Sequence, residues 1–179
     1  MTDYFALLQK ERRPWLDPEG LKEKYFALSR LAPPDAPLNE AYRVLSDPKL
    51  RLHHLLSLER VDLAAGRPVP PAVADLFWKT GAVLREAERW LTQNAGTSTA
   101  LQRSLAAAGR TRLQGRISEV DEQLRPTYES RLEQLRQLDA TWKAASPNVP
   151  QLLELYDSIA YLSRLLEQIA EKKFQLEVA

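Results

Sequence analysis

The C-terminal stretch of this 179-residue chain limits its fold more than any other part, because an apolar residue recurs there at every third or fourth position. The spacing alternates between three and four residues over Leu152, Leu155, Ile159, Leu162, Leu166 and Ile169. Such spacing places one apolar stripe along a helix. A helix with this stripe packs lengthwise against antiparallel neighbours. The sequence therefore predicts a helical bundle at this end of the chain.

Helix start and stop signals divide the rest of the chain into further helices. Asp17-Pro18 and Asp47-Pro48 each place a capping carboxylate before a proline, which is typical of a helix N-terminus. The proline-rich segment 32–37 ends one helix and precedes the next, because proline donates no backbone hydrogen bond. One of the residues at 97–99 is expected to cap a long helix, and Pro126 predicts a kink or break at Arg125.

The segment GRPVPP, residues 66–71, interrupts the helical periodicity and is the best position for a domain boundary. We predict an all-α fold with a small helical domain over residues 1–65, a linker over 66–71 and a three-helix bundle over 72–179.

Composition excludes several classes of function. The chain has 25 basic and 24 acidic residues, no cysteine and only 6 glycines. This nearly neutral balance gives no broad attraction to nucleic acid or membranes. The chain has no thiolate metal site, and it carries no glycine-rich phosphate loop. We therefore expect neither an enzyme nor a cofactor. No apolar run is long enough to cross a bilayer and no secretory signal is evident, so a cytoplasmic location is expected.

The two histidines, His53 and His54, are adjacent. Neighbouring positions on a helix point about 100° apart, so the pair is poorly placed to chelate a metal. We expect one of them to be partly buried and the other to be solvated.

Two stretches carry a resemblance to a known family. LKEKYFALSR is followed by NEAYRVLSDPKLRLHHLLSLERVDL, and residues 3–63 together resemble the J-domain of HscB-type iron–sulfur cluster co-chaperones. The family pattern Asn-x-Ala-Tyr-x-x-Leu, Pro-x-x-Arg and Leu-Leu-Ser-Leu is matched by Asn39, Ala41, Tyr42, Leu45, Pro48, Arg51 and residues 55–58. The resemblance implies a J-domain followed by a three-helix C-terminal domain, and it continues more weakly from residue 70 onward.

In J-domains the turn after the second helix carries His-Pro-Asp, which engages a DnaK-type chaperone and triggers its ATPase. The corresponding residues here are Pro33, Pro34 and Asp35, so proline replaces histidine, and most of the loop that follows this motif in the family is missing. Imidazole offers two nitrogens for hydrogen bonds, whereas a proline side chain offers none. The resemblance further implies chaperone contacts through a basic helix face, which is formed here by Lys22, Lys24 and Arg30. The alternative for this face is a solvated surface without a partner.

The family also binds an iron–sulfur scaffold protein through its C-terminal domain, and the matching residues here are Leu76, Phe77 and Tyr161. Burial in the core is the alternative explanation of Leu76 and Tyr161. Phe77 and Trp78 are adjacent, so both cannot face one core. We expect one of the two to be exposed, and exposed aromatic residues tend to anchor partners.

The functional interpretation that follows is a co-chaperone or adaptor in iron–sulfur protein maturation, with lost or weakened stimulation of an HscA-like, DnaK-type ATPase. A rival interpretation is a helical protein- or RNA-binding module that uses the segment 103–116. This segment contains Arg103, Arg110, Arg112 and Arg116 and no acidic residue until Glu119. The alternative for these arginines is a solvated face balanced by acids of neighbouring helices.

Overall fold

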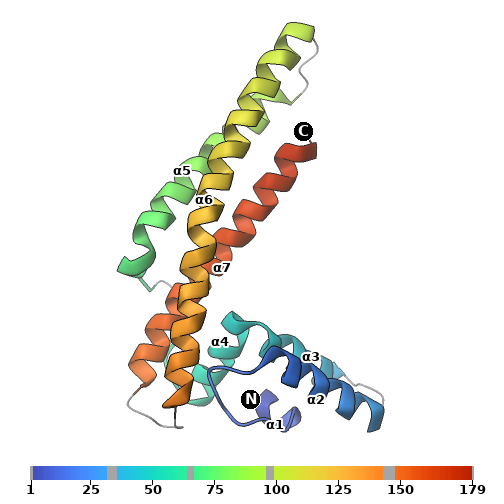
Figure 1. Ribbon diagram of the computed structural model, residues 1–179, viewed down its shortest axis with the longest axis vertical. Helices are drawn as coiled ribbons and strands as arrows, with labels where there is room; N and C mark the ends of the chain where they lie inside the picture. Colours follow the sequence, from blue (N-terminus) through green and yellow to red (C-terminus); the bar gives the residue numbers. More distant parts are fainter. Residues whose placement is uncertain (1, 32–35, 64–66, 96–98, 143–147, 179) are drawn as a thin grey trace. The chain divides into compact units, whose positions relative to one another are not determined.

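The computed structural model describes residues 2–31, 36–63, 67–95, 99–142 and 148–178. Within these ranges it contains seven helices and no strand, which confirms the all-α prediction (Figure 1). The helices are α1 (Tyr4–Leu7), α2 (Pro18–Leu31), α3 (Ala36–Ser46), α4 (Pro48–Leu58), α5 (Pro71–Asn94), α6 (Ala100–Ala140) and α7 (Val149–Val178).

The predicted capping residues lie where the helices begin. The Asp17 carboxylate accepts a hydrogen bond of 2.7 Å from the backbone N–H of the third residue of α2. Asp47 does the same for α4 at 2.9 Å. Thr99, just before α6, and Gln102, in its first turn, form a reciprocal pair: each side-chain oxygen accepts from the other residue's backbone N–H, at 3.2 and 3.1 Å. These contacts satisfy backbone donors that the first turn of a helix leaves open.

Of the kink or break predicted at Arg125, the break does not occur, because helix α6 runs without interruption through Pro126. Pro126 itself is exposed, whereas Leu124 and Leu135 on the same helix are fully buried. Burial of large apolar side chains on both sides of Pro126 stabilises the helical path by more than the single backbone hydrogen bond that proline removes.

The chain divides into two compact units. The first consists of Met1–Pro68 and Arg131–Ile159, and the second of Val69–Ser130 and Ala160–Ala179. The chain passes from the first unit to the second inside the segment 66–71, while α6 and α7 each contribute residues to both units. The domain limits drawn from the sequence remain a prediction.

In the first unit, the buried side chain of Arg51 connects three segments. Its Nε donates to the Pro14 carbonyl at 2.9 Å and its Nη1 to the Leu45 carbonyl at 2.7 Å. Its guanidinium also lies 5.8 Å from the centre of the Trp15 ring. A charged donor that supplies two buried carbonyls holds the loop before α2, the end of α3 and the helix α4 together. Arg51, which resembles the family's Pro-x-x-Arg residue, therefore has a structural role.

The same loop is fixed to the end of α6 by the buried carboxylate of Asp139. Asp139 accepts hydrogen bonds from Arg13 Nη2 at 2.7 Å and from the Trp15 backbone N–H at 3.1 Å. Arg136, one turn earlier on α6, places its guanidinium 4.6 Å from the centre of the Trp15 ring. The loop that leads into α2 is thus held by hydrogen bonds and cation–π contacts as well as by apolar packing.

The two histidines are placed as the sequence predicts, one buried and one exposed. His54 is buried, and its Nε2 accepts a hydrogen bond of 3.1 Å from the Tyr4 backbone N–H. Burial lowers the pKa of His54, and the nearby Asp3 carboxylate only partly opposes this effect. His53 is exposed, with its ring 6.0 Å from that of Tyr156. His54 therefore acts as a neutral hydrogen-bond acceptor in the core.

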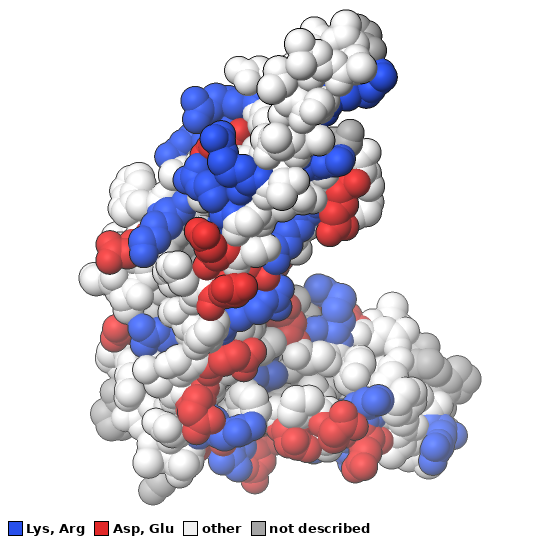
Figure 2. Space-filling view, turned by 45° about the horizontal axis from the view of Figure 1, so that its top comes forward, with Lys and Arg blue, Asp and Glu red and all other residues white. Residues whose placement is uncertain are grey.

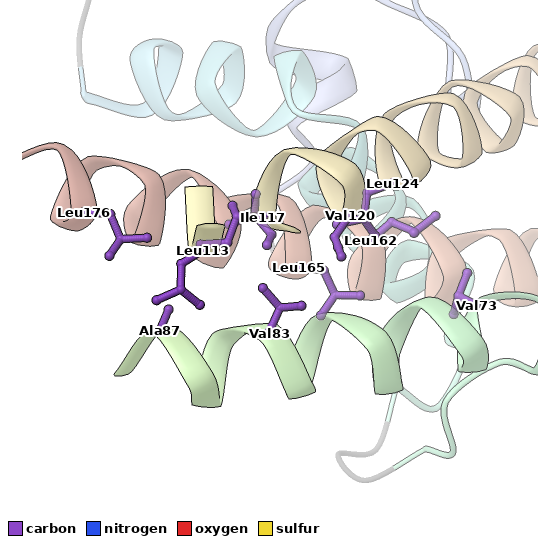
Figure 3. Close-up of a cluster of buried hydrophobic side chains, with 11 residues drawn as sticks. Val73, Val83, Ala87, Leu113, Ile117, Val120, Leu124, Leu162, Leu165 and Leu176 are labelled. Carbon is purple, nitrogen blue, oxygen red and sulfur yellow. The ribbon is translucent and has the colours of Figure 1, made fainter. Parts of the chain in front are cut away.

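The core of the second unit comes from all three long helices (Figure 3). Its buried members are Val73, Val83 and Ala87 of α5, Leu113, Ile117, Val120 and Leu124 of α6, and Leu162, Leu165, Ile169 and Leu176 of α7. The labelled side chains point toward one common interior in Figure 3. The periodicity of the C-terminal stretch predicted Leu162 and Ile169 of this buried face, whereas Leu165 is buried in place of Leu166, which is only partly buried.

Candidate functional site

Helices α2 and α3, which flank the proline-rich turn, are joined by aromatic and polar contacts. The Tyr25 hydroxyl donates to Asn39 Oδ1 at 2.7 Å, and the Tyr25 and Tyr42 rings stack with their centroids 4.4 Å apart. Asn39 and Tyr42 belong to the motif by which the chain resembles J-domains. Their contacts fix the spacing of the two helices on either side of the turn. The turn residues Pro33, Pro34 and Asp35 themselves lie outside the described residues.

The three cations predicted on α2 differ in their surroundings. Lys24 is half-buried, and its ammonium donates to Gln9 Oε1 at 2.6 Å. Lys22 is exposed, with its ammonium 3.9 Å from the Glu19 carboxylate, and Arg30 is exposed in the last turn. Only Lys22 and Arg30 of the three therefore project an exposed cationic group from the helix.

Phe26 is a further exposed residue on this helix, and the sequence reasoning did not single it out. Its side chain is 50% exposed, and it lies one helical turn from Lys22 and one from Arg30. Residues four apart share a helix face. The spacing in the sequence could have indicated this face, because Phe26 lies four residues after Lys22 and four before Arg30. The outward face of α2 is thus cationic with an apolar centre.

The residues predicted to bind a scaffold protein come together in the second unit. The rings of Phe77 on α5 and Tyr161 on α7 meet edge to face with their centroids 6.3 Å apart. Leu76, Phe77 and Tyr161 are half-buried and pack against the core of this unit. Each of these side chains therefore supports the core and also reaches the surface, and the contact with a scaffold protein stays a prediction.

Trp78 is the exposed member of the adjacent aromatic pair, with 67% of its side-chain surface open. Its ring meets the ring of Phe77 edge to face at 5.3 Å. We call Leu76, Phe77, Trp78 and Tyr161 the aromatic patch. Lys79 stands beside it, exposed, with its ammonium 3.4 Å from Gln123 Oε1. Aromatic surface next to a cation is suited to binding another protein.

The arginine-rich segment 103–116 is partly neutralised by the neighbouring helix. Arg116 and Arg112 of α6 both form ion pairs with Glu86 of α5. Farther along, the buried Asp121 accepts hydrogen bonds from Lys173 at 2.7 Å and from Arg125 at 3.0 Å. Burial alone raises the pKa of the Asp121 carboxyl, but the hydrogen bonds from Lys173 and Arg125 outweigh this effect and lower it. These pairs connect the three long helices.

Metal-binding constellations are not evident in the described part of the chain. No group of three His, Cys, Asp or Glu side chains in the described residues is placed to hold a metal ion. None of the helices in the described ranges combines the length and apolar character needed to cross a membrane.

Comparison with known proteins identifies the architecture. No protein-family model matches the chain, and no curated protein matches its sequence. Among solved structures, the chain is similar to the chaperone HscB from Vibrio cholerae, with a TM-score of 0.50 and 19% sequence identity. The similarity covers 98% of this chain and 96% of that chain. The resemblance seen in the sequence is therefore confirmed at the level of the fold: the chain has an HscB-like fold.

Proposed function

We propose that this protein is an HscB-like co-chaperone or adaptor in the maturation of iron–sulfur proteins, and that its stimulation of a DnaK-type chaperone ATPase is lost or weakened. The observation that carries the proposal is the HscB-like fold over nearly the whole chain. The Tyr25–Asn39 and Tyr25–Tyr42 contacts support it, because they preserve the paired helices that present the turn. Of the two roles, we favour the adaptor.

The composition of the turn favours the adaptor role. Proline at position 33 has no side-chain nitrogen to take the place of imidazole in the family's His-Pro-Asp motif. The exposed cations Lys22 and Arg30 keep the means to attract an acidic chaperone surface. Docking can therefore persist while stimulation of hydrolysis is lost.

Binding and hydrolysis must be measured separately to test this proposal. We expect the protein to bind its cognate DnaK-type chaperone but to raise its steady-state ATPase rate little. Reversing both exposed cations, in Lys22→Glu with Arg30→Glu, is expected to weaken binding at low salt. Arg164→Glu, an exposed site on α7, is the matched control and should leave binding unchanged. Robust stimulation of the ATPase by the wild type would contradict the adaptor role.

Substitution of the turn distinguishes a missing imidazole from a shortened loop. Pro33→His is expected to leave stimulation low, because the turn is also shorter than in the family. Full recovery of stimulation by this single substitution would show that the imidazole was the only missing element.

The aromatic patch is the proposed contact for an iron–sulfur scaffold protein of the IscU type. Trp78 is the residue to change, because its side chain is 67% exposed while Phe77 also supports the core. Trp78→Ser is expected to weaken scaffold binding about 10-fold or more without changing stability. Phe174→Ser on α7, which removes a side chain that is 63% exposed in the same unit, is the control. Equal losses in both variants would show that general surface hydrophobicity, and no specific contact, drives binding.

The rival RNA-binding function makes a different prediction. Binding to phosphates weakens steeply with salt, since each neutralised phosphate releases counterions. The ion pairs of Arg112 and Arg116 with Glu86 count against this function, because they use part of the positive charge within the protein. Absence of RNA binding at low salt excludes it.

A further inference from the structure

The first turns of α6 carry an apolar stripe that is open to solvent. Leu101 is 71% exposed and Leu105 is 67% exposed. Ala108 and Arg112 are also exposed and continue the same spacing of four, three and four residues. Residues at these intervals share one face of a helix, and this is the spacing of a seam against which another helix packs. We call these four residues the α6 stripe.

The α6 stripe ends in a small surface cavity between α5 and α6. The cavity has a volume of about 250 Å³, and its lining includes Arg89, Trp90 and Gln93 of α5 together with Arg112 of α6. Arg112 therefore belongs to both the stripe and the cavity. Its side chain is 75% exposed and lies 3.8 Å from Glu86, which also pairs with Arg116. Two guanidinium groups and the Glu86 carboxylate thus border the cavity, and this carboxylate is shared between Arg112 and Arg116.

The surroundings of the stripe are strongly cationic. The described residues 85–95 and 99–116 contain six arginines and two glutamates, a net charge of +4. Figure 2 shows Lys and Arg side chains gathered near this end of the α5–α6 hairpin, with uncharged surface between them. Of these residues, Arg89 and Arg110 form no ion pair with any described residue. An apolar seam within a cationic surface attracts a partner that is apolar along one side and acidic around it.

Other occupants fit this surface less well. A second copy of the chain would bring the same +4 surface against itself, and like charges in contact oppose association. A nucleic acid would gain from exposed aromatic rings that stack on its bases, whereas the stripe presents two leucines, an alanine and an arginine and no aromatic ring. A lipid surface requires a broad apolar face for insertion, and the stripe has only two large apolar side chains, Leu101 and Leu105.

We propose that the α6 stripe binds an amphipathic helix of an acidic partner protein. The apolar residues of that helix pack on Leu101, Leu105 and Ala108, and a carboxylate one turn farther on enters the cavity beside Arg89 and Arg112. This contact uses neither the turn after α2 nor the aromatic patch. It can therefore be tested independently of the chaperone and scaffold contacts proposed above.

The test uses a fluorescein-labelled helical peptide whose leucines are spaced four and three residues apart, with glutamates on its flanks and one turn beyond. A matched peptide carries lysine at every glutamate position. In anisotropy titrations of the full chain, the acidic peptide is expected to bind, and the lysine peptide to bind at least about 10-fold more weakly. Raising the salt concentration should weaken only the acidic peptide's binding.

Two double variants separate the apolar and electrostatic contributions. Leu101→Gln with Leu105→Gln should weaken binding of the acidic peptide about 10-fold or more. Arg89→Gln with Arg112→Gln should weaken it and also reduce its salt dependence. The control is Phe174→Gln, which changes an exposed apolar residue outside the stripe and should have no effect. Unchanged thermal unfolding of each variant shows that the fold is retained.

Several outcomes overturn the proposal. The acidic peptide failing to bind at up to ~100 μM, or binding no better than the lysine peptide, contradicts it. So does an equal effect of Phe174→Gln and the leucine variants. Tighter binding to vesicles of phosphatidylcholine with phosphatidylglycerol assigns the surface to a membrane. Tighter binding to a single-stranded oligouridine assigns it to nucleic acid.

Discussion

Replacing the buried Arg51 by methionine is expected to destabilise the first unit strongly. Methionine fills much of the same volume but donates no hydrogen bond. The carbonyls of Pro14 and Leu45, which now accept at 2.9 and 2.7 Å, would lose this donor. The contact with the Trp15 ring would lose its cationic character.

The magnitude follows from two opposing contributions. Each hydrogen bond from a charged donor contributes roughly 1.5–3 kcal/mol, and two are lost. Methionine avoids the desolvation of a buried guanidinium, which offsets part of that loss. We expect the free energy of unfolding to fall by about 2–3 kcal/mol, or roughly 30- to 150-fold in the unfolding equilibrium. Arg51→Lys should lose about 1–2 kcal/mol, because an ammonium lacks the planar fork that reaches both carbonyls.

Amide hydrogen exchange is the suitable assay, because the two units need not unfold together. Protection should fall for the amides of α3 and α4 and change little for those in the core of the second unit. Arg60→Met, which removes an exposed arginine from the same unit, is the control and is expected to change stability by less than about 0.5 kcal/mol. Equal stability of Arg51→Met and the wild type would refute the reasoning, since it would show that desolvation cancels both hydrogen bonds.

Two further predictions concern protonation and helix packing. Because burial lowers the pKa of His54 while the unfolded chain titrates near 6.5, only the unfolded chain takes up the proton just below that pH. The contribution of His54 to stability is therefore fully present above pH 6.5 and is lost as the pH falls below it. In His54→Gln, whose amide oxygen can still accept from the Tyr4 N–H, urea unfolding should show a smaller loss of stability as the pH falls. An equal loss of stability in the variant and the wild type would contradict this explanation. Gly115→Ala should raise the free energy of unfolding by about 0.5–1 kcal/mol, because alanine favours the helix more than glycine does. The added Cβ has room, since it meets nothing within 4 Å. Gly109→Ala should lack this gain, since its Cβ would lie 2.7 Å from Trp90 Nε1; equal gains in thermal unfolding would show that the indole moves aside freely.

Local features of the fold could be predicted from the sequence because short-range physics decides them. Asp17 and Asp47 cap the helices that follow them, since an aspartate before proline satisfies the first backbone donors in nearly any context. The apolar spacing of α7 likewise identified Leu152, Ile159 and Leu162 as buried. The HscB-like architecture followed from motif residues rather than from periodicity, which many helical proteins share.

The candidate surfaces could be predicted only in part. The sequence indicated that Phe77 and Trp78 cannot both face the core, but it did not indicate which one is exposed. That choice depends on where Tyr161 lies, because its ring meets Phe77 and leaves Trp78 open. Phe26 was missed because its exposure depends on the packing of α2 against the rest of the unit, which one helical segment does not reveal.

By itself the sequence determined the helical class and most helix ends. It also indicated that one histidine is buried and the other solvated, and that proline stands where the family has histidine. The tertiary structure decided that His54 is the buried one, because its Nε2 meets the Tyr4 N–H. It also decided that α6 continues through Pro126, because burial of Leu124 and Leu135 on either side outweighs one lost hydrogen bond. Spacing along the chain sets which residues share a face, whereas long-range contacts decide which face is covered.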